Sequence, residues 1–421
     1  MKKGIVSGIV VSALTLASVS PGWGMQLFND KKLDSLVERL QKKGVLTEEE
    51  VREFKAADQK SANEHSFKAG VRLQLRYEYK EGDIAERTSD LNIRRARISF
   101  EGNMYPEVAY KFEVALDGME DLSMKDASLT FGQLGPYAQL RVGQFKTPFS
   151  RQRIASSGKL QMIDRSPIEK LYPGRDIGFE LSGKNILGVL DYGVAMEAGV
   201  GDKRKFKNTD NSEWWYDGRI ACHPLGEVPL AEGDVQYTDN FRFEIAANGL
   251  YAPSQVAFGE RSIHDMFLAD EVYTAQAAAI KAIGNGTKLS GLPAGMIGDT
   301  IIWGPELTII YKGLSLAMEY YKATYTPEDT VSFRKIHSEG YFVQGGAFVI
   351  PKTLELTARY DRFDRNTEAK TQSDTREYTV GVNYFPTGDH NYKWQANYIW
   401  RKEDWKEIDN NSLVMNLQVA Y

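Results

Sequence analysis

Apolar and polar residues alternate with a period of two from residue 66 to the end of the chain. In residues 71–80 every odd-numbered position is apolar and every even-numbered position is polar. The apolar positions are Val71, Leu73, Leu75, Tyr77 and Tyr79. Because successive side chains of a β-strand point to opposite faces, this segment is predicted to be a strand with one apolar face.

The same alternation recurs in sixteen segments. They are residues 67–80, 91–102, 107–117, 124–132, 137–146, 176–183, 189–200, 214–222, 241–252, 301–311, 314–325, 339–350, 353–363, 376–385, 391–401 and 412–421. Barrels of the bacterial outer membrane contain an even number of antiparallel strands. The sequence therefore predicts an all-β fold, a 16-stranded antiparallel transmembrane β-barrel over residues 66–421.

The connections between these segments support the same fold. Most even-numbered connections are tight, such as Gly135-Pro136, Lys312-Gly313 and Pro351-Lys352, whereas the odd-numbered ones are longer and more polar. Outer-membrane barrels have short periplasmic turns and longer outer loops. Residues 223–240 break the rule, because they form a long even-numbered connection that the pattern does not explain.

Tyrosine and tryptophan residues gather near the ends of the predicted strands. Examples are Tyr77, Tyr79, Tyr392, Trp394, Trp400 and Trp405. Aromatic girdles of this kind mark the two membrane–water interfaces of a barrel. A soluble two-sheet protein would also alternate, but it has no reason to separate long from short connections in this way.

The first 24 residues are predicted to be a signal peptide. Lys2 and Lys3 precede an apolar stretch from Ile5 to Val19, and Gly22-Trp23-Gly24 places small residues before a cut after Gly24. A cut after Ser20 also fits, and the alternative interpretation is a short N-terminal anchor helix.

Residues 25–65 are predicted to be a short periplasmic helical segment. Leu33, Leu36 and Leu40 recur at helical spacing, and Thr47 with Glu50 forms a capping box for a second helix. Two short helices with one apolar stripe bury little surface alone. We expect them either to associate with copies of themselves or a neighbouring surface, or to form a flexible tether.

Composition and charge exclude several function classes. The chain has a formal net charge of −5, which disfavours nucleic-acid binding, and a single cysteine, Cys222, which excludes a disulfide framework. The five histidines are scattered, and no nucleophile motif, metal-binding motif or phosphate-cradling loop is present. We therefore expect no enzyme activity, no catalytic residue, no metal site and no cofactor.

Residues 147–175 form the third long connection and combine apolar with basic residues. Apolar residues such as Phe149, Ile168 and Tyr172 favour burial, so we predict that this loop folds into the barrel lumen. Its six basic residues outnumber its two acidic ones, Asp164 and Glu169. The basic residues are Arg151, Arg153, Lys159, Arg165, Lys170 and Arg175. Cationic groups at a constriction raise the local concentration of anions, so this loop is predicted to bind anions.

Four cations on the predicted strands are expected to line the lumen beside this loop. They are Arg95, Arg97, Lys111 and Arg141. The alternative is that these groups pair with lumen carboxylates and serve only to stiffen the barrel. The candidate carboxylates are Glu101, Glu113, Asp126 and Glu180.

Several motifs resemble the phosphate-selective porin O and P family. They are Arg94-Arg95-Ala96-Arg97, Tyr110-Lys111-Phe112-Glu113, the run from Arg141-Val142-Gly143-Gln144 to Pro148-Phe149-Ser150, and Pro173-Gly174-Arg175-Asp176-Ile177-Gly178. The similarity covers roughly residues 66–421 and is densest from 91 to 183. Residues 43–47 are also similar to the N-terminal segment of many members.

The resemblance implies a trimeric outer-membrane porin of 16 strands, with the third loop folded inside and periplasmic N-terminal helices. It implies passive diffusion of small anionic solutes such as phosphate, in contact with outer-membrane lipid and with no nucleic-acid partner. Polyphosphate, other oxyanions or a general solute remain open, because the pore residues of the family do not align individually onto this chain. The alternatives are a non-selective porin and a structural or adhesive barrel with a plugged lumen.

Overall fold

A computed structural model describes most of the chain beyond residue 64 and little before it. The described residues are 41–42, 47, 65–82, 87–117, 122–133, 135–172, 174–199, 214–255, 257–258, 261–262, 298–330, 335–367, 374–403 and 410–421. The predicted signal peptide, nearly all of the predicted helical segment 25–65, and Trp405 lie outside these residues.

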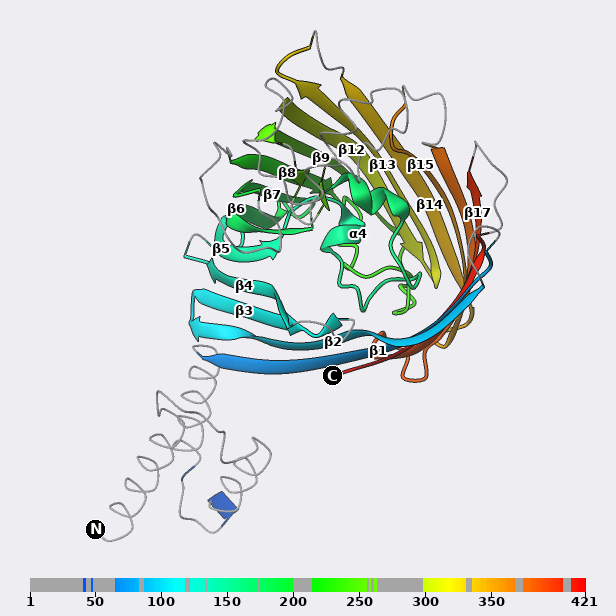
Figure 1. The fold of residues 1–421 in the computed structure, drawn as a ribbon. Coiled ribbons are helices and arrows are strands. Elements are labelled where there is room, and N and C mark those ends of the chain that lie inside the picture. The colour runs from blue at the N-terminus through cyan, green and yellow to red at the C-terminus, as the bar shows by residue number, and fades with distance from the viewer. Residues whose placement is uncertain are drawn as a thin grey trace, which may run out of the picture. The chain divides into compact units, whose positions relative to one another are not determined.

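Sixteen strands form one closed antiparallel barrel (Figure 1). They are β1 Ser66–Lys80, β2 Thr88–Tyr105, β3 Val108–Ala115, β4 Ser123–Phe131, β5 Gln139–Lys146, β6 Arg175–Ile186, β7 Leu190–Glu197, β8 Trp215–Cys222, β9 Arg242–Gln255, β12 Gly298–Tyr311, β13 Leu314–Pro327, β14 Ile336–Ile350, β15 Leu354–Asp364, β16 Asp374–Tyr384, β17 Tyr392–Glu403 and β18 Ser412–Ala420. Each predicted strand is present, so the predicted fold is confirmed.

The remaining elements are short. A two-stranded sheet pairs β10 Ala257–Phe258 with β11 Arg261–Ser262, and the connection after β5 carries helix α4 Arg151–Ile154 and the 3₁₀ helix η2 Pro167–Leu171. None of the helices in the described part of the chain is long and apolar enough to cross a membrane.

The barrel closes through its first and last strands. β1 pairs antiparallel with β18, and the register sets Arg72 opposite Ala420 and Lys80 opposite Ser412. Every other neighbour in the ring is adjacent in the chain, apart from β9 and β12, which the β10–β11 hairpin separates. Closure leaves no unpaired edge among these sixteen described strands, which a lipid environment requires.

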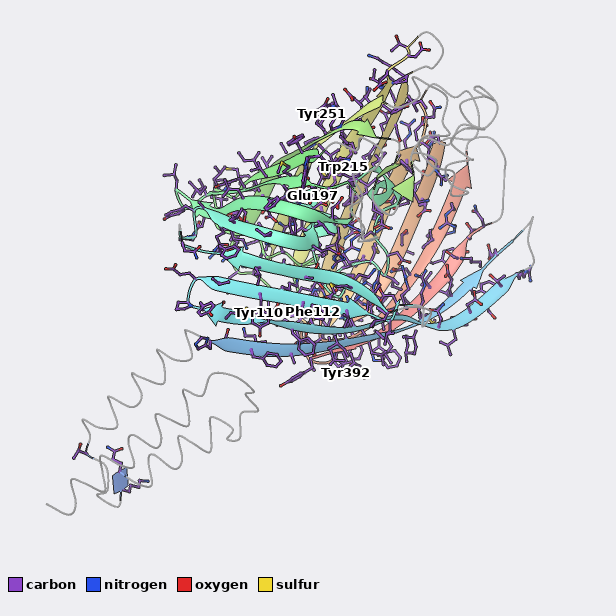
Figure 2. All side chains as sticks on the ribbon, turned by 60° about the vertical axis from the view of Figure 1, so that its left-hand side comes forward. Tyr110, Phe112, Glu197, Trp215, Tyr251 and Tyr392 are labelled. Atoms are coloured by element: carbon purple, nitrogen blue, oxygen red, sulfur yellow. The ribbon has the colours of Figure 1, made fainter. Side chains whose placement is uncertain are left out.

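The alternation along each strand separates an apolar outer face from a polar inner face. On β1, Leu73 and Leu75 are 40% and 38% exposed, whereas Gln74 and Arg76 are 2% and 8% exposed. Figure 2 shows side chains projecting from both faces of the strands. A soluble protein buries its apolar residues, so this inverted pattern is typical of a barrel that faces lipid.

The wall of the barrel is uneven in length. β3, β5, β7 and β8 contain 8 residues each, whereas β12 and β13 contain 14 and β14 contains 15. A tilted strand needs about 9–11 residues to span a bilayer. We call the stretch from β3 to β8 the short wall, and the stretch from β12 to β17 the tall wall.

The chain divides into two compact units, residues 1–68 with 101–110, and residues 69–100 with 111–421. In the first unit, the Asn103 backbone N–H donates to Ser66 Oγ at 3.0 Å, and Tyr105 packs edge-on against His65. The candidate site lies within the second unit.

Candidate functional site

The connection between β5 and β6 crosses the inside of the barrel (Figure 1). Phe149, Ile168 and Tyr172 are all at most 3% exposed and belong to an apolar cluster with residues of β8, β9, β12, β13, β14 and β15. The Tyr321 ring on β13 lies 5.1 Å from the Phe149 ring and 5.2 Å from the Tyr172 ring. The apolar residues therefore fix residues 147–172 against the inner face of the tall wall. We call these residues the inner segment.

Buried polar groups hold the start of the inner segment in a strained turn. Ser150 adopts a φ of 62°, its N–H donates to Asn248 Oδ1 at 3.0 Å, and its hydroxyl donates to Glu319 Oε2 at 2.7 Å. The backbone N–H of Arg151 donates to Glu306 Oε1 at 2.9 Å. A non-glycine residue keeps such a φ only where its surroundings over-determine it, and here β9, β12 and β13 do so.

The middle of the inner segment is held by the far side of the barrel. Lys393 Nζ on β17 donates to Leu160 O at 2.8 Å, and the Ile163 N–H donates to Asn397 Oδ1 at 2.8 Å. Farther round the ring, Gln418 Nε2 on β18 donates to Gly158 O at 2.9 Å. The inner segment thus follows the wall from β9 to β18, which leaves the space beside β1–β7 open.

Two glycines of the family-like motifs lie at close approaches. Gly143 on β5 has a φ of 123°, and an added Cβ would lie 2.2 Å from Ala127 O on β4. At Gly174, an added Cβ would lie 1.8 Å from an Arg153 guanidinium nitrogen. Gly143 is required, because it lets β5 pack closely on β4, whereas the flexible Arg153 side chain can move away from a Cβ at position 174.

Residues 223–241 form the long even-numbered connection that departs from the expected pattern of short turns. The structure explains its length, because this connection folds into the barrel and supports the inner segment. The Glu232 N–H donates to Lys159 O at 2.9 Å. The Glu232 carboxylate accepts from Gln152 Nε2 at 2.8 Å, from the Gln161 N–H at 2.7 Å and from Gln344 Nε2 at 3.1 Å. This connection therefore joins the start and the middle of the inner segment to β14.

A cavity of about 550 Å³ lies between the inner segment and the strands from β1 to β9. Fourteen of its lining residues are basic and nine are acidic, an excess of five positive charges. The whole chain carries a net charge of −5, so the positive charge is concentrated around this cavity.

Eight of the ten predicted site residues line this cavity. They are Arg151, Arg153, Arg165, Arg175, Arg95, Arg97, Lys111 and Arg141. Lys159 lies away from it, exposed in the turn whose carbonyl accepts from Glu232. Lys170 also lies away from it, half-buried in η2, because that helix directs its apolar residues Ile168 and Leu171 into the wall.

Several lining cations pair with carboxylates, as the alternative interpretation of the sequence proposes. Arg175 Nε lies 2.7 Å from Asp126 Oδ1, and an Arg141 guanidinium nitrogen lies 3.1 Å from Glu180 Oε2. Arg97 contacts Glu113 at 3.1 Å and Asp117 at 2.6 Å. Arg151 is also buried, 2.8 Å from Glu244 Oε1. Its guanidinium also donates to Val228 O at 3.1 Å and to Pro229 O.

Four lining cations bond only to neutral groups among the described residues. The Arg72 guanidinium donates to Ser156 Oγ at 2.7 Å, and the Arg95 guanidinium donates to Gln74 Oε1 at 2.8 Å. Lys146 Nζ donates to Ile154 O and Ala155 O at 2.8 and 2.7 Å. Arg165 Nε donates to Gln152 O at 2.9 Å. We call Arg72, Arg95, Lys146 and Arg165 the uncompensated cations.

Neutral acceptors orient the uncompensated cations, and none of the described carboxylates forms an ion pair with them. Arg165 is close enough to Arg95 and Lys146 for their charges to repel. Burial, with repulsion from Arg153, lowers the pKa of Arg165 to about 10, so this guanidinium is still protonated at neutral pH. Fixed cations at the edge of an open cavity attract diffusible anions.

Sequence reasoning missed several lining cations, including Arg72, Arg94, Lys125 and Lys146. Arg72 and Lys146 carried a usable signal, since each stands on the polar face or at the end of a correctly predicted strand. Their separation from carboxylates depends on contacts between distant segments, which the alternation does not encode.

Solved structures similar to this chain include outer-membrane proteins. An anion-selective porin from Comamonas acidovorans matches with a TM-score of 0.53 at 10% identity, over 85% of this chain and all (100%) of that chain. The outer membrane channel DcaP of Acinetobacter baumannii matches with a TM-score of 0.53 at 12% identity, over 85% of this chain and 98% of that chain. OmpT of Vibrio cholerae in its trimer form matches with a TM-score of 0.52 at 12% identity, over 85% of this chain and 100% of that chain. At these identities the likeness concerns the fold alone.

Sequence comparisons go further than the fold. An uncharacterized protein of Aquifex aeolicus (strain VF5) is 25% identical over 436 aligned residues, which cover 92% of this chain and 94% of that protein. The family model for phosphate-selective porin O and P matches residues 67–421, the whole of the predicted barrel except its first residue. With a closed 16-stranded barrel, a lipid-facing exterior and a polar lumen, the chain is therefore a bacterial outer-membrane porin and belongs to the phosphate-selective porin O and P family.

Proposed function

We propose that this porin is a passive diffusion channel with a preference for small anions such as phosphate. Solutes would cross beside the short wall, between β1–β7 and the inner segment. The observation that carries the proposal is the excess of five positive charges among the cavity-lining residues. The four uncompensated cations are among these lining residues.

Two features of the cavity suit a transported anion. Guanidinium groups offer several planar donors to an oxyanion, and lysine adds a point charge. The paired arginines, such as Arg97 and Arg175, are held rigid by their carboxylates, which favours an open geometry over a collapsed one. The inner segment leaves the cavity open, which favours a channel over the alternative of a plugged structural barrel.

The test is ion selectivity in a planar bilayer. Refolded protein in a gradient of potassium chloride should give a reversal potential that reports anion preference, and added phosphate should reduce the chloride current. Arg95→Gln combined with Arg165→Gln should lower the anion preference. Lys159→Gln is the matched control, since Lys159 lies outside the cavity lining. If the wild type prefers cations or has no preference, anion selectivity is contradicted and the protein is a general porin. Absence of conductance would favour a plugged barrel.

The N-terminal arrangement is also part of the proposal. Residues 1–24 would direct export and be removed, residues 25–65 would form a periplasmic helical segment, and residues 66–421 would form the barrel with its inner loop 147–175. Mass spectrometry of the mature protein from outer membranes tests this. A chain that begins near residue 25 supports it, and a chain that retains Lys2 and Lys3 contradicts it.

We infer that the porin assembles as a homotrimer through the short wall. β3, β5, β7 and β8 have 8 residues each, fewer than a bilayer-spanning strand needs. Contact with a second copy would cover this wall, and OmpT of Vibrio cholerae, which shares the fold, has a trimer form. Light scattering in detergent that gives a monomer mass would overturn this inference.

A further inference from the structure

Two glutamates on neighbouring strands face each other beneath the start of the inner segment. Glu306 on β12 stands directly opposite Glu319 on β13, and both are only 4% exposed. The Tyr321 hydroxyl lies 2.7 Å from Glu306 Oε1 and 3.1 Å from Glu319 Oε2. Two buried carboxyl groups therefore lie close to one hydroxyl, although their other partners differ.

Glu306 is surrounded as a charged carboxylate is. Its Oε2 accepts from Arg219 Nε at 3.0 Å and lies 2.7 Å from a second nitrogen of that guanidinium. Its Oε1 accepts from the Arg151 backbone N–H at 2.9 Å and from Asn248 Nδ2 at 2.7 Å. A buried carboxylate with a guanidinium partner and several other donors can remain charged.

Glu319 has a different environment, because all of its hydrogen-bond partners among the described residues are neutral groups. Its Oε1 accepts from the Gln152 backbone N–H at 2.8 Å, and its Oε2 accepts from Ser150 Oγ at 2.7 Å. The third partner is the Tyr321 hydroxyl. Two of these three contacts hold the inner segment.

The charges around Glu319 leave no cation for it. Arg151 and Arg219 both bind Glu244 Oε1 on β9, at 2.8 and 2.5 Å, and Arg219 also binds Glu306. The other polar groups that face Glu319 come from connection 223–241, β14 and the inner segment. They are Glu232 and Gln344, which line a separate small cavity beside Glu319, and Tyr172. An ionised Glu319 would therefore be an unpaired buried charge, which is costly.

The hydrogen atoms available between the two glutamates favour a protonated Glu319. Tyr321 has one hydroxyl hydrogen, which it donates to the nearer and charged Glu306. The 3.1 Å contact between Tyr321 Oη and Glu319 Oε2 then needs a hydrogen from Glu319. With that proton, Ser150 donates to Glu319, Glu319 to Tyr321 and Tyr321 to Glu306, and each hydrogen is used once.

We propose that a proton on Glu319 holds the start of the inner segment against β13, so that the channel opens further as the pH rises. The protonated side chain keeps Ser150, with its φ of 62°, and Gln152 in place. Loss of the proton puts a second negative charge beside Glu306. The ionised carboxylate accepts hydrogen bonds more strongly, but a buried charge without a cation costs more than two such bonds return. This inference concerns the width of the channel and is independent of its ion preference.

Trypsin cleavage of the inner segment tests the proposal without relying on conduction. The refolded full-length porin is treated briefly with trypsin at values from about pH 6 to about pH 9, a range that covers the titration of buried carboxyl groups. Fragments cut after Arg151 or Arg153 are identified by mass. We expect their yield to rise by about tenfold across this range, because cleavage follows the population of the released segment. Single-channel conductance should rise over the same range.

Glu319→Gln removes the titration and keeps a neutral side chain of the same length. This variant should be cleaved slowly, and should keep a constant conductance, at every pH. Glu339→Gln is the matched control, because Glu339 on β14 also accepts from a β13 tyrosine, Tyr320, at 3.2 Å. It should behave as the wild type does. The three proteins are treated side by side at each pH, so that changes in the activity of trypsin itself cancel.

Three results would overturn the proposal. Cleavage of the wild type that does not change with pH would mean that no proton holds the segment. A rise retained in Glu319→Gln would assign the titration to another group, such as Glu197, which accepts from Thr147 Oγ1 at 3.0 Å. Rapid cleavage of Glu319→Gln at every pH would show that a charged Glu319 holds the segment.

Infrared difference spectra keep the proposal testable if Glu319→Gln fails to fold. The carbonyl band of a protonated carboxyl group should be lost between about pH 6 and about pH 9 in the wild type. In Tyr321→Phe this band should shift in frequency, because the Glu319 carboxyl loses its hydrogen-bond partner. An unshifted band would also overturn the proposal.

Discussion

The Arg72 guanidinium on β1 donates a 2.7 Å hydrogen bond to Ser156 Oγ in the inner segment, across 84 residues of sequence. The bond orients a cation toward the cavity without neutralising it. It also joins the first strand of the barrel to the segment that narrows the lumen. This one contact therefore directs the Arg72 charge into the cavity and also anchors the inner segment to β1. Two variants can separate these roles.

Arg72→Met should lower the anion-to-cation permeability ratio by about tenfold, because one unit charge at roughly 6 Å in a water-like dielectric attracts an anion and repels a cation by about 0.7 kcal/mol each. Ser156→Ala keeps the charge and should leave the ratio nearly unchanged while increasing current noise. Reversal potentials and single-channel traces report the two effects. Equal ratios for Arg72→Met and the wild type would remove Arg72 from the proposed mechanism.

Glu232→Ala should lower anion preference, although it removes a negative charge. The Glu232 carboxylate accepts three hydrogen bonds that hold the inner segment, and it is not among the residues that line the cavity. Its loss should therefore loosen the segment, raise conductance and displace the cations. If Glu232 acted only through its negative charge, its removal would instead raise the anion preference.

Glu227→Gln is the control for that prediction, because Glu227 belongs to the same connection but lines the cavity. Neutralising it should raise anion preference with little change in conductance. If both variants raise the preference, Glu232 acts through its charge and does not position the inner segment.

Phe149→Ala should release the inner segment while the barrel stays folded. Phe149 is fully buried against Tyr172 and Tyr321, and truncating a buried phenylalanine costs about 3–5 kcal/mol. The expected results are higher conductance and cleavage of residues 147–172 by added protease. Leu187→Ala, at a turn position that is 91% exposed, should change neither. Resistance of Phe149→Ala to protease would show that the hydrogen bonds of the inner segment hold it in place without the Phe149 ring.

Gly143→Ala should impair barrel assembly more than Gly249→Ala. The Gly143 backbone has a φ of 123° and no room for a Cβ, whereas an added Cβ at Gly249 would meet nothing within 4 Å. Strain of this kind costs about 1–3 kcal/mol before the clash is counted. Urea titration of the folded barrel gives the comparison, and equal midpoints would contradict the prediction.

The strands were predictable because one physical cause, lipid outside and water inside, acts on every one of them. β13 is expected at 314–325 and runs from Leu314 to Pro327, and β18 is expected at 412–421 and runs from Ser412 to Ala420. The apolar residues of the inner segment were informative because large apolar side chains avoid water. Phe149 and Tyr172 require burial wherever the chain takes them.

The individual role of each cation was not predictable from the sequence. Lys146 and Lys159 look alike in a sequence, but β5 ends so that Lys146 faces the cavity, while a turn carries Lys159 away from it. The inward path of residues 223–241 was also missed. It depends on Glu232 meeting Gln152, Gln161 and Gln344, which are far apart in the chain.

The inner segment has a consequence for how this porin family can vary. Strand number fixes the circumference of a barrel, but here the opening is set by a peptide that lines about half of the wall. Substitutions in residues 147–172 can retune the sieving size and charge of the channel without altering any lipid-facing residue. Permeability and membrane insertion are thus encoded in separate parts of one chain, and each can change while the other is preserved.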